Sequence, residues 1–259
     1  MWTIAGKTCH SHILLGTAQY PSLEILENAI QASKTDIITV SLKRENPFEH
    51  KHNAFWESLK QFKGHILPNT AGCKSAREAV ELAKMSREIF NTHWIKLEVI
   101  GDDYLLQPHP FELVKAARTL IDLGFEVFPY CTEDLVLCQR LYDMGCQILM
   151  PWGSPIGSGK GILNPFQCSV LRSRLPNATL IVDAGIGSPL HAMQAMLLGF
   201  DGILMNSAIS KAKDPVKMAA AFCLAVESGR LAYQAGVMPE IDFAVPSTPL
   251  PETLFWSKV

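Results

Sequence analysis

Three ionisable residues lie on or at the end of short apolar segments, where their side chains could act together. Lys96 and Glu98 stand two residues apart in the apolar segment 94–100, and Asp183 ends the apolar segment 180–183. Because side chains alternate between the two faces of a strand, Lys96 and Glu98 share one face. Burial disfavours the ammonium form of a lysine, lowers its pKa and frees a nucleophilic amine. We therefore expect Lys96 to form an imine with a carbonyl substrate while Glu98 and Asp183 move protons.

The same three residues also have purely structural interpretations. An internal ion pair between Lys96 and Glu98, or a lysine that reaches water at a strand edge, would account for the first two. Asp183 could instead cap a helix or form a salt bridge. The positions of the other polar residues are what favour chemistry.

Three turns rich in small residues follow the last three apolar segments and could bind an anion. They span 153–159 (Gly-Ser-Pro-Ile-Gly-Ser-Gly), 185–189 (Gly-Ile-Gly-Ser-Pro) and 206–208 (Asn-Ser-Ala). Glycine lets backbone N–H groups approach an anion, and Ser188-Pro189 begins a helix whose positive end can face it. Ordinary tight turns are the alternative, since glycine serves these as well. Together the turns predict a phosphate site.

Metal-binding patterns do not stand out in the sequence. The histidine pairs His10/His12 and His50/His52 do not form an HExxH motif, and the seven cysteines include no CxxC pair. We predict no metal site, and we interpret the cysteines as reduced thiols.

Eight short apolar, β-branched segments alternate with stretches of helical periodicity. The segments are 13–16, 37–42, 65–69, 94–100, 125–131, 147–153, 179–185 and 202–207. Helix signals mark residues 74–90 and the stretch that Asp214-Pro215 opens and Gly236 closes. The alternation of strands and helices implies parallel strands joined by right-handed crossovers. Eight such strand-helix units in 259 residues suit a closed (β/α)8 TIM barrel of the α/β class. A doubly wound open sheet is the alternative.

Polar residues at the segment ends favour the barrel over the open sheet. Thr17, Asn69, Glu98, Asp183 and Asn206 fall at or just past the carboxyl ends of their segments. In a barrel these ends share one mouth, where the active sites of this fold lie.

One catalytic domain, residues 1–236, and one tail, residues 237–259, make up the chain in this interpretation. No linker or longer repeat divides the first part. In the second part several prolines interrupt regular structure, while Phe255 and Trp256 are apolar. We expect the tail either to be disordered or to pack on a neighbour.

Charge and hydropathy exclude several classes of partner. The chain has 23 basic and 25 acidic residues, so its net charge of -2 creates no strong field for nucleic acid or an anionic membrane. The longest apolar run, 218–226, is too short to span a membrane, and the N-terminus lacks the pattern of a signal peptide. We expect a cytoplasmic protein.

Five ordered motifs closely resemble the bacterial thiazole synthase family, and the match spans roughly residues 12 to 236. The motifs are PNTAGC at 68–73, KLEVIGD at 96–102, VFPYCT at 127–132, GSPIGSG at 153–159 and VDAGIG at 182–187. Several long motifs in the same order are far more specific than any single glycine turn.

The resemblance implies a (β/α)8 enzyme of thiamin biosynthesis that builds thiazole phosphate carboxylate from three components. These are 1-deoxy-D-xylulose 5-phosphate, sulfur from the C-terminal thiocarboxylate of a small sulfur-carrier protein, and a glycine-derived imine that another enzyme produces. In the family, the lysine matching Lys96 forms the imine with the sugar ketone, and carboxylates matching Glu98 and Asp183 move protons. The positions that hold the sugar phosphate match Gly157, Ala184, Gly185, Asn206 and Ser207. The resemblance implies no bound cofactor, and it suggests a homotetramer.

Departures from the family pattern are few, and two other functions fit part of the sequence. Ser207 stands where threonine is more usual, which preserves the hydroxyl, and segment 15–20 lacks a more usual glycine and lysine. Another Schiff-base aldolase or isomerase of phosphosugars would share the lysine and the phosphate turns. A non-catalytic scaffold for the sulfur carrier is the second alternative, but the intact Lys96, Glu98 and Asp183 argue against it.

Overall fold

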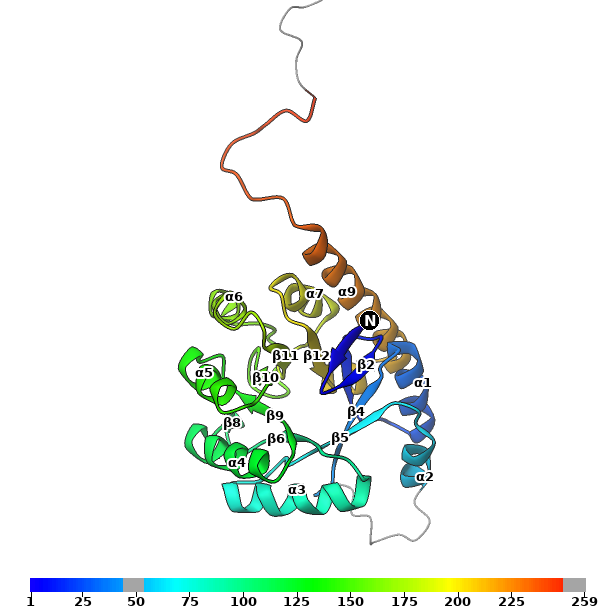
Figure 1. Cartoon of the computed structure of the whole chain (residues 1–259). Helices are drawn as coiled ribbons and strands as arrows, with labels where there is room; N and C mark the ends of the chain where they lie inside the picture. The colour runs from blue at the N-terminus through cyan, green and yellow to red at the C-terminus, as the bar shows by residue number, and fades with distance from the viewer. Residues whose placement is uncertain (44–53, 249–259) are drawn as a thin grey trace, which may run out of the picture.

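Eight parallel strands close into a barrel in the computed structural model, which describes residues 1–43 and 54–248 (Figure 1). The strands are β3 (Ile13–Gly16), β4 (Ile37–Ser41), β5 (His65–Asn69), β6 (Trp94–Leu97), β9 (Glu126–Cys131), β10 (Ile148–Pro151), β11 (Thr179–Asp183) and β12 (Gly202–Met205). Around the barrel they follow chain order, and β12 pairs with β3 to close it. The predicted (β/α)8 barrel is confirmed, and all eight predicted segments contain one of these strands.

Helices surround the barrel, as Figure 1 shows. They are α1 (Leu23–Ser33), α2 (Ala54–Gln61), α3 (Ala76–Phe90), α4 (Pro110–Asp122), α5 (Leu135–Asp143), α6 (Pro165–Arg174), α7 (Pro189–Leu197), the single turn α8 (Ser207–Ser210) and α9 (Pro215–Ala235). The predicted ends of the last helix are confirmed. The Asp214 side chain accepts the Lys217 N–H at its start, and Gly236 adopts a φ of +81° at its end.

Two apolar layers hold the barrel together. Ile95, Leu97 and Val99 belong to the layer between the strands and the helices. Trp94 and Phe128 face the other way and pack 5.4 Å apart, between ring centroids, inside the barrel. This alternation along β6 therefore leaves Lys96 on the inward face, as the sequence predicts.

A short N-terminal hairpin, β1 (Trp2–Ile4) with β2 (Lys7–Cys9), was not predicted. Ile4 and Cys9 are fully buried against the interior residues at the amino ends of the strands. The Trp2 indole N–H donates to the Ser11 carbonyl at 2.9 Å, which ties the hairpin to the start of β3. The hairpin therefore covers the end of the barrel opposite the carboxyl mouth.

A second hairpin, β7 (Ile100–Asp102) with β8 (Gln107–Pro108), replaces the end of the predicted strand 94–100. The strand β6 ends at Leu97, and beyond it the backbone of Glu98 bonds the Thr70 side chain instead of a neighbouring strand. The chain then turns out of the barrel, so this hairpin lies beside the mouth, where Leu106 lines the cavity described below.

The chain beyond α9 forms no helix or strand as far as residue 248. Figure 1 shows it leading away from the barrel, and residues 237–248 are all exposed. Phe255 and Trp256 lie outside the described residues, as do His50 and His52. None of the helices in residues 1–43 and 54–248 combines the length and the apolar composition that a membrane-spanning helix requires.

Candidate active site

Lys96, Glu98 and Asp183 meet inside the barrel. The Lys96 Nζ lies 3.1 Å from Glu98 Oε1 and 2.6 Å from Asp183 Oδ2. The three side chains are 7%, 7% and 4% exposed. Because β9 and β10 separate β6 from β11 in the barrel, the second contact joins strands that are not neighbours.

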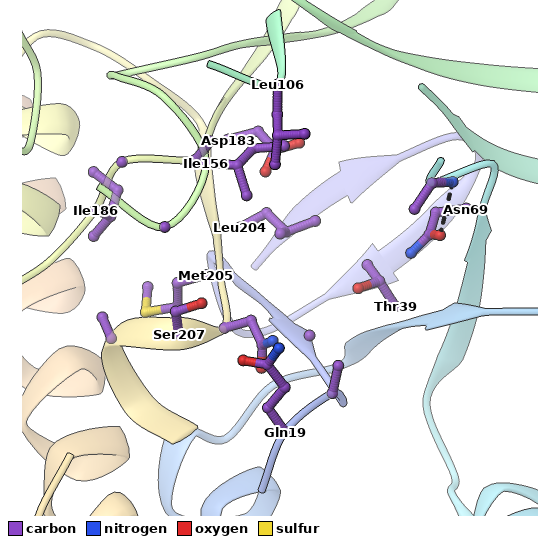
Figure 2. Close-up of a pocket in the computed structure, with 18 of the residues that line it drawn as sticks. Gln19, Thr39, Asn69, Leu106, Ile156, Asp183, Ile186, Leu204, Met205 and Ser207 are labelled. Atoms are coloured by element: carbon purple, nitrogen blue, oxygen red, sulfur yellow. Dashed lines mark hydrogen bonds between the residues drawn. The ribbon is translucent and has the colours of Figure 1, made fainter. Parts of the chain in front are cut away.

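A cavity of about 710 Å³ opens at the carboxyl ends of the strands, and all eight predicted site residues line it. They are Lys96, Glu98, Asp183, Gly157, Ala184, Gly185, Asn206 and Ser207. Figure 2 shows Asp183, Leu106 and Ile156 grouped in one part of the cavity, and Gln19 and Ser207 in another. The predicted amine, carboxylates and small-residue turns therefore share one space large enough for a small substrate.

The structure corrects the expected charge of Lys96. Burial alone lowers the pKa of this amine, but attraction to the Asp183 and Glu98 carboxylates outweighs burial, and the pKa lies above its usual value. The prediction of a neutral amine is therefore wrong while Lys96 is paired with these carboxylates. The alternative interpretation, an ion pair between Lys96 and Glu98, is confirmed. Burial also raises the pKa of Asp183, although the charge of Lys96 opposes that shift. Asp183 thus combines closeness to Lys96 with an unusually high proton affinity for a carboxylate.

The turn after β11 has a backbone that only small residues allow. Ala184 and Gly185 adopt φ values of +70° and +80°, and a Cβ at Gly185 would overlap Ser154. Their carbonyl oxygens accept hydrogen bonds from the N–H groups of Gly153, at 3.3 Å, and Gly161, at 2.8 Å. The loop after β10 therefore fixes the shape of the turn after β11, and both loops border the cavity.

The third predicted turn begins where β12 ends. Asn206 precedes α8, and Ser207 is its first residue. Gly16 at the end of β3 faces Asn206, because a Cβ at Gly16 would come within 2.6 Å of the Asn206 Cβ. The glycine in the first strand therefore makes room for a predicted phosphate-binding side chain.

Comparisons with known proteins show which family the chain is similar to. A profile of the family described as thiazole biosynthesis protein ThiG matches residues 3–249. The chain belongs to the ThiG family. Thiazole synthase of Coxiella burnetii is 57% identical over 251 residues, which is 96% of each chain. Thiazole synthase of Bradyrhizobium diazoefficiens is 55% identical over 259 residues, covering 100% of both.

A solved structure with the same fold is also similar in sequence. The crystal structure of the Amycolatopsis orientalis BexX/CysO complex contains a chain that superposes with a TM-score of 0.82 at 29% identity. The match covers 93% of this chain and 98% of that chain. Family membership confirms the resemblance found in the motifs, and with it an enzyme of the thiazole synthase class in thiamin biosynthesis.

Two further lysines line the cavity of this ThiG-family protein, and the sequence analysis did not select either of them. Lys74 pairs with Asp103. Lys211 has no ion pair within the described part of the chain, and its backbone N–H donates to the Ser207 carbonyl at 3.1 Å. Its position four residues after Ser207 was the only available signal, since a lysine in a loop is usually solvated.

Gln19 and Tyr130 also belong to the surroundings of the ThiG-family site. Gln19 lines the cavity with a φ of +66°, in the segment that departs from the family pattern. The Tyr130 ring centroid lies 5.8 Å from the Lys96 Nζ, and the Tyr130 hydroxyl donates to the Leu106 carbonyl at 3.4 Å. Burial, then the Asp183 and Glu98 charges, raise the pKa of Tyr130, so it remains a neutral phenol.

Metal ligands do not cluster in the residues that the structure describes. In residues 1–43 and 54–248, no group of three histidine, cysteine, aspartate or glutamate side chains is placed to hold a metal ion. The chemistry that the described residues themselves supply is that of an amine between two carboxylates.

Proposed function

We propose that Lys96 forms a Schiff base with the ketone of 1-deoxy-D-xylulose 5-phosphate, and that this imine is the first intermediate of thiazole formation. The observation that carries the proposal is the placement of a buried amine, 2.6 Å from one carboxylate and 3.1 Å from another, in a cavity of about 710 Å³. The reaction, formation of a thiazole, is proposed from the thiazole synthases to which the chain is similar.

Proton transfer between Lys96 and Asp183 prepares the amine. Asp183 takes the ammonium proton across the 2.6 Å contact, which gives a neutral amine and a neutral carboxylic acid. The amine attacks the ketone carbon, the Asp183 carboxylic acid protonates the resulting alkoxide, and the Asp183 carboxylate removes a second proton from the nitrogen to give a neutral carbinolamine. The carboxylic acid then passes this second proton to the carbinolamine hydroxyl, which leaves as water. The resulting iminium acidifies the adjacent C–H bond, and Glu98 or Asp183 removes that proton. The rearranged sugar then presents an electrophilic carbon to sulfur.

The sugar phosphate occupies the small-residue turns in this proposal. Gly157, Ala184, Gly185, Asn206 and Ser207 supply backbone N–H groups and two polar side chains along one side of the cavity. The residue types support this assignment, since Gly157 and Gly185 have no side chain and Ala184 has only a methyl group, so that an anion can approach their backbone. No bound cofactor enters the sequence of steps.

Two proteins supply the remaining atoms. A small sulfur-carrier protein inserts its C-terminal thiocarboxylate, and a separate enzyme provides the glycine-derived imine. The BexX structure supports a protein partner, because that relative was solved in complex with a second protein, CysO. We further propose a homotetramer, with residues 1–236 as the catalytic barrel of each subunit and residues 237–259 as its tail; the end of α9 at Ala235 supports that boundary.

Borohydride trapping tests the imine directly. Reduction in the presence of 1-deoxy-D-xylulose 5-phosphate should add one sugar phosphate to Lys96, which peptide mass spectrometry locates. Lys96→Met should lose the adduct, whereas Lys74→Met, which removes an exposed lysine at the same cavity, should keep it. An adduct on another lysine, or none, would contradict the proposal.

Asp183→Asn separates imine formation from the later proton transfers. The variant should still be trapped, although more slowly. Asp183 no longer takes and returns the proton during imine formation, but the amide leaves Lys96 with Glu98 alone and therefore with a lower pKa. Its turnover with a thiocarboxylate carrier should fall about 100-fold or more, since general acid-base groups contribute this much.

The unmodified protein should also incorporate sulfur from the carrier. If it turned over a different phosphosugar without incorporating sulfur, it would be an aldolase or isomerase instead.

A further inference from the structure

Thr70 makes three hydrogen bonds to the backbone that carries Lys96 and Glu98. It follows the last residue of β5, and it is fully buried. Its backbone N–H donates to the Lys96 carbonyl at 3.1 Å. Its hydroxyl donates to the Glu98 carbonyl at 2.7 Å and accepts the Glu98 N–H at 2.7 Å.

The Thr70 hydroxyl replaces strand-to-strand hydrogen bonds just beyond the end of β6. The strand β6 ends at Leu97, and Lys96 is the β6 residue in register with Asn69 of β5. One residue beyond the strand, the Thr70 side chain bonds both polar groups of the Glu98 backbone. A side chain thereby extends the strand geometry far enough to keep Glu98 on the inward face, before the chain leaves for the β7–β8 hairpin.

Thr70 itself does not reach the substrate cavity. It is absent from the described residues that line the cavity, whereas Lys96 and Glu98 both line it. Any effect of the hydroxyl on chemistry must therefore pass through the Glu98 backbone. The Glu98 carboxylate is 3.1 Å from the Lys96 Nζ, so a small backbone movement would change this contact.

We infer that Thr70 is a positioning residue, whose hydroxyl holds the Glu98 backbone so that the Glu98 carboxylate stays against the Lys96 amine during catalysis. The inference rests on the imine chemistry proposed above. A valine at position 70 keeps the shape of threonine but leaves the Glu98 N–H and C=O without their partner. The backbone then relaxes and the carboxylate withdraws from the amine, which slows proton transfer, because catalytic groups depend on placement to within about 1 Å.

The Lys96 amine should also titrate differently once Glu98 withdraws. The titratable groups that face it are Glu98 from the end of β6, Asp183 from β11 and Tyr130 from β9. Of these, the carboxylates stabilise the ammonium form. Weakening one of them lowers the pKa of Lys96, so the pH at which trapping is half-maximal should fall by about half a unit or more.

A matched pair of threonines provides the experiment. Thr35 is also buried, and its hydroxyl bonds the backbone in the same manner. It accepts the Ile37 N–H at 3.2 Å, and its one hydrogen is within donating distance of the Ile13 carbonyl at 2.6 Å and the Ile37 carbonyl at 2.8 Å. It lies just before β4, at the amino ends of the strands. Thr70→Val should lower kcat about 10- to 100-fold, with KM for the sugar phosphate within about twofold, while Thr35→Val leaves kcat unchanged. Thr70→Ser, which keeps the hydroxyl, should restore kcat.

A double variant separates positioning from general loss of stability. If Thr70 acts through Glu98, adding Thr70→Val to Glu98→Gln should lower kcat less than about twofold further. An additional tenfold loss in that background, or wild-type kcat and an unshifted trapping profile in Thr70→Val alone, would overturn the inference. So would failure of both Thr70→Val and Thr70→Ala to fold while Thr35→Val folds, since the hydroxyl would then be structural. Absence of trapping in the wild type would instead refute the proposed imine itself.

Discussion

At the scale of single residues, the site is an amine held by two carboxylates whose charges do not cancel. Lys96 carries one positive charge against Glu98 and Asp183, and burial makes each unpaired charge costly. Sequence periodicity placed Lys96 beside Glu98 correctly. It gave the wrong direction for the pKa shift of Lys96. The closest carboxylate, Asp183, lies 87 residues later in the chain, and the periodicity of a sequence does not show how close two strands come across a barrel.

Removal of the Lys96 charge should make stability depend on pH. In Lys96→Met the two carboxylates are left buried together, so the pKa of Asp183, already raised by burial, rises further. A raised carboxyl pKa favours the protonated folded state, so stability is greatest at low pH and is lost as pH rises through the folded pKa. Urea unfolding should show a deficit against wild type of about 3–5 kcal/mol at pH 8 that shrinks towards pH 5. Lys74→Met should show no such pH dependence, and an equal deficit at both pH values would contradict the argument.

Lys211 should contribute to phosphate affinity. It is the cavity lysine that lacks an ion pair within residues 1–43 and 54–248, and it follows Ser207 by four residues. An exposed lysine strengthens anion binding modestly, so Lys211→Met should raise KM for 1-deoxy-D-xylulose 5-phosphate about 3- to 10-fold and leave kcat unchanged. Borohydride trapping of 1-deoxy-D-xylulose, the same sugar without its phosphate, should be weak and should be equal in wild type and Lys211→Met. If the variant impaired both sugars equally, Lys211 would serve another purpose.

At the scale of elements, the strands were predictable and the two hairpins were not. The strand segments are apolar runs of four to seven residues, several with polar residues at or near their ends, as at Asp183 and Asn206, so both the strands and the mouth of the barrel could be inferred. The hairpins β1–β2 and β7–β8 have strands of two or three residues, which is too short for periodicity to show. The end of β6 depended on a side-chain hydrogen bond from Thr70, which no pattern of hydropathy records.

The N-terminal hairpin should stabilise the barrel without affecting chemistry. Ile4 is 1% exposed and packs in the interior cluster with Leu14 and Trp94, far from the carboxyl mouth. Ile4→Ala should therefore cost about 2–4 kcal/mol in urea unfolding, while kcat stays within about twofold of wild type. Val245→Ala, in the exposed part of the tail, provides the control for stability. A loss of kcat in well-folded Ile4→Ala would mean that the two ends of the barrel are coupled.

At the scale of the whole molecule, the barrel and its helices end at Gly236, and the exposed stretch 237–248 lies outside them. Its large apolar side chains are Val237, Met238, Ile241, Phe243 and Val245, each at least half exposed. So many apolar side chains in one short extended segment are unusual on a monomer, whereas a neighbouring subunit would bury them.

We therefore expect the tail to contact another subunit of the proposed tetramer. A charge at Phe243, which is 71% exposed, should be tolerated within one chain but not at a subunit contact. Phe243→Asp should shift the assembly towards smaller species in sedimentation velocity, while Asp242→Asn, at the adjacent position, should not. Borohydride trapping at Lys96 should persist in both variants, because the cavity-lining residues described here belong to a single barrel. An unchanged sedimentation profile for Phe243→Asp would show that this part of the tail lies free of the subunit interface.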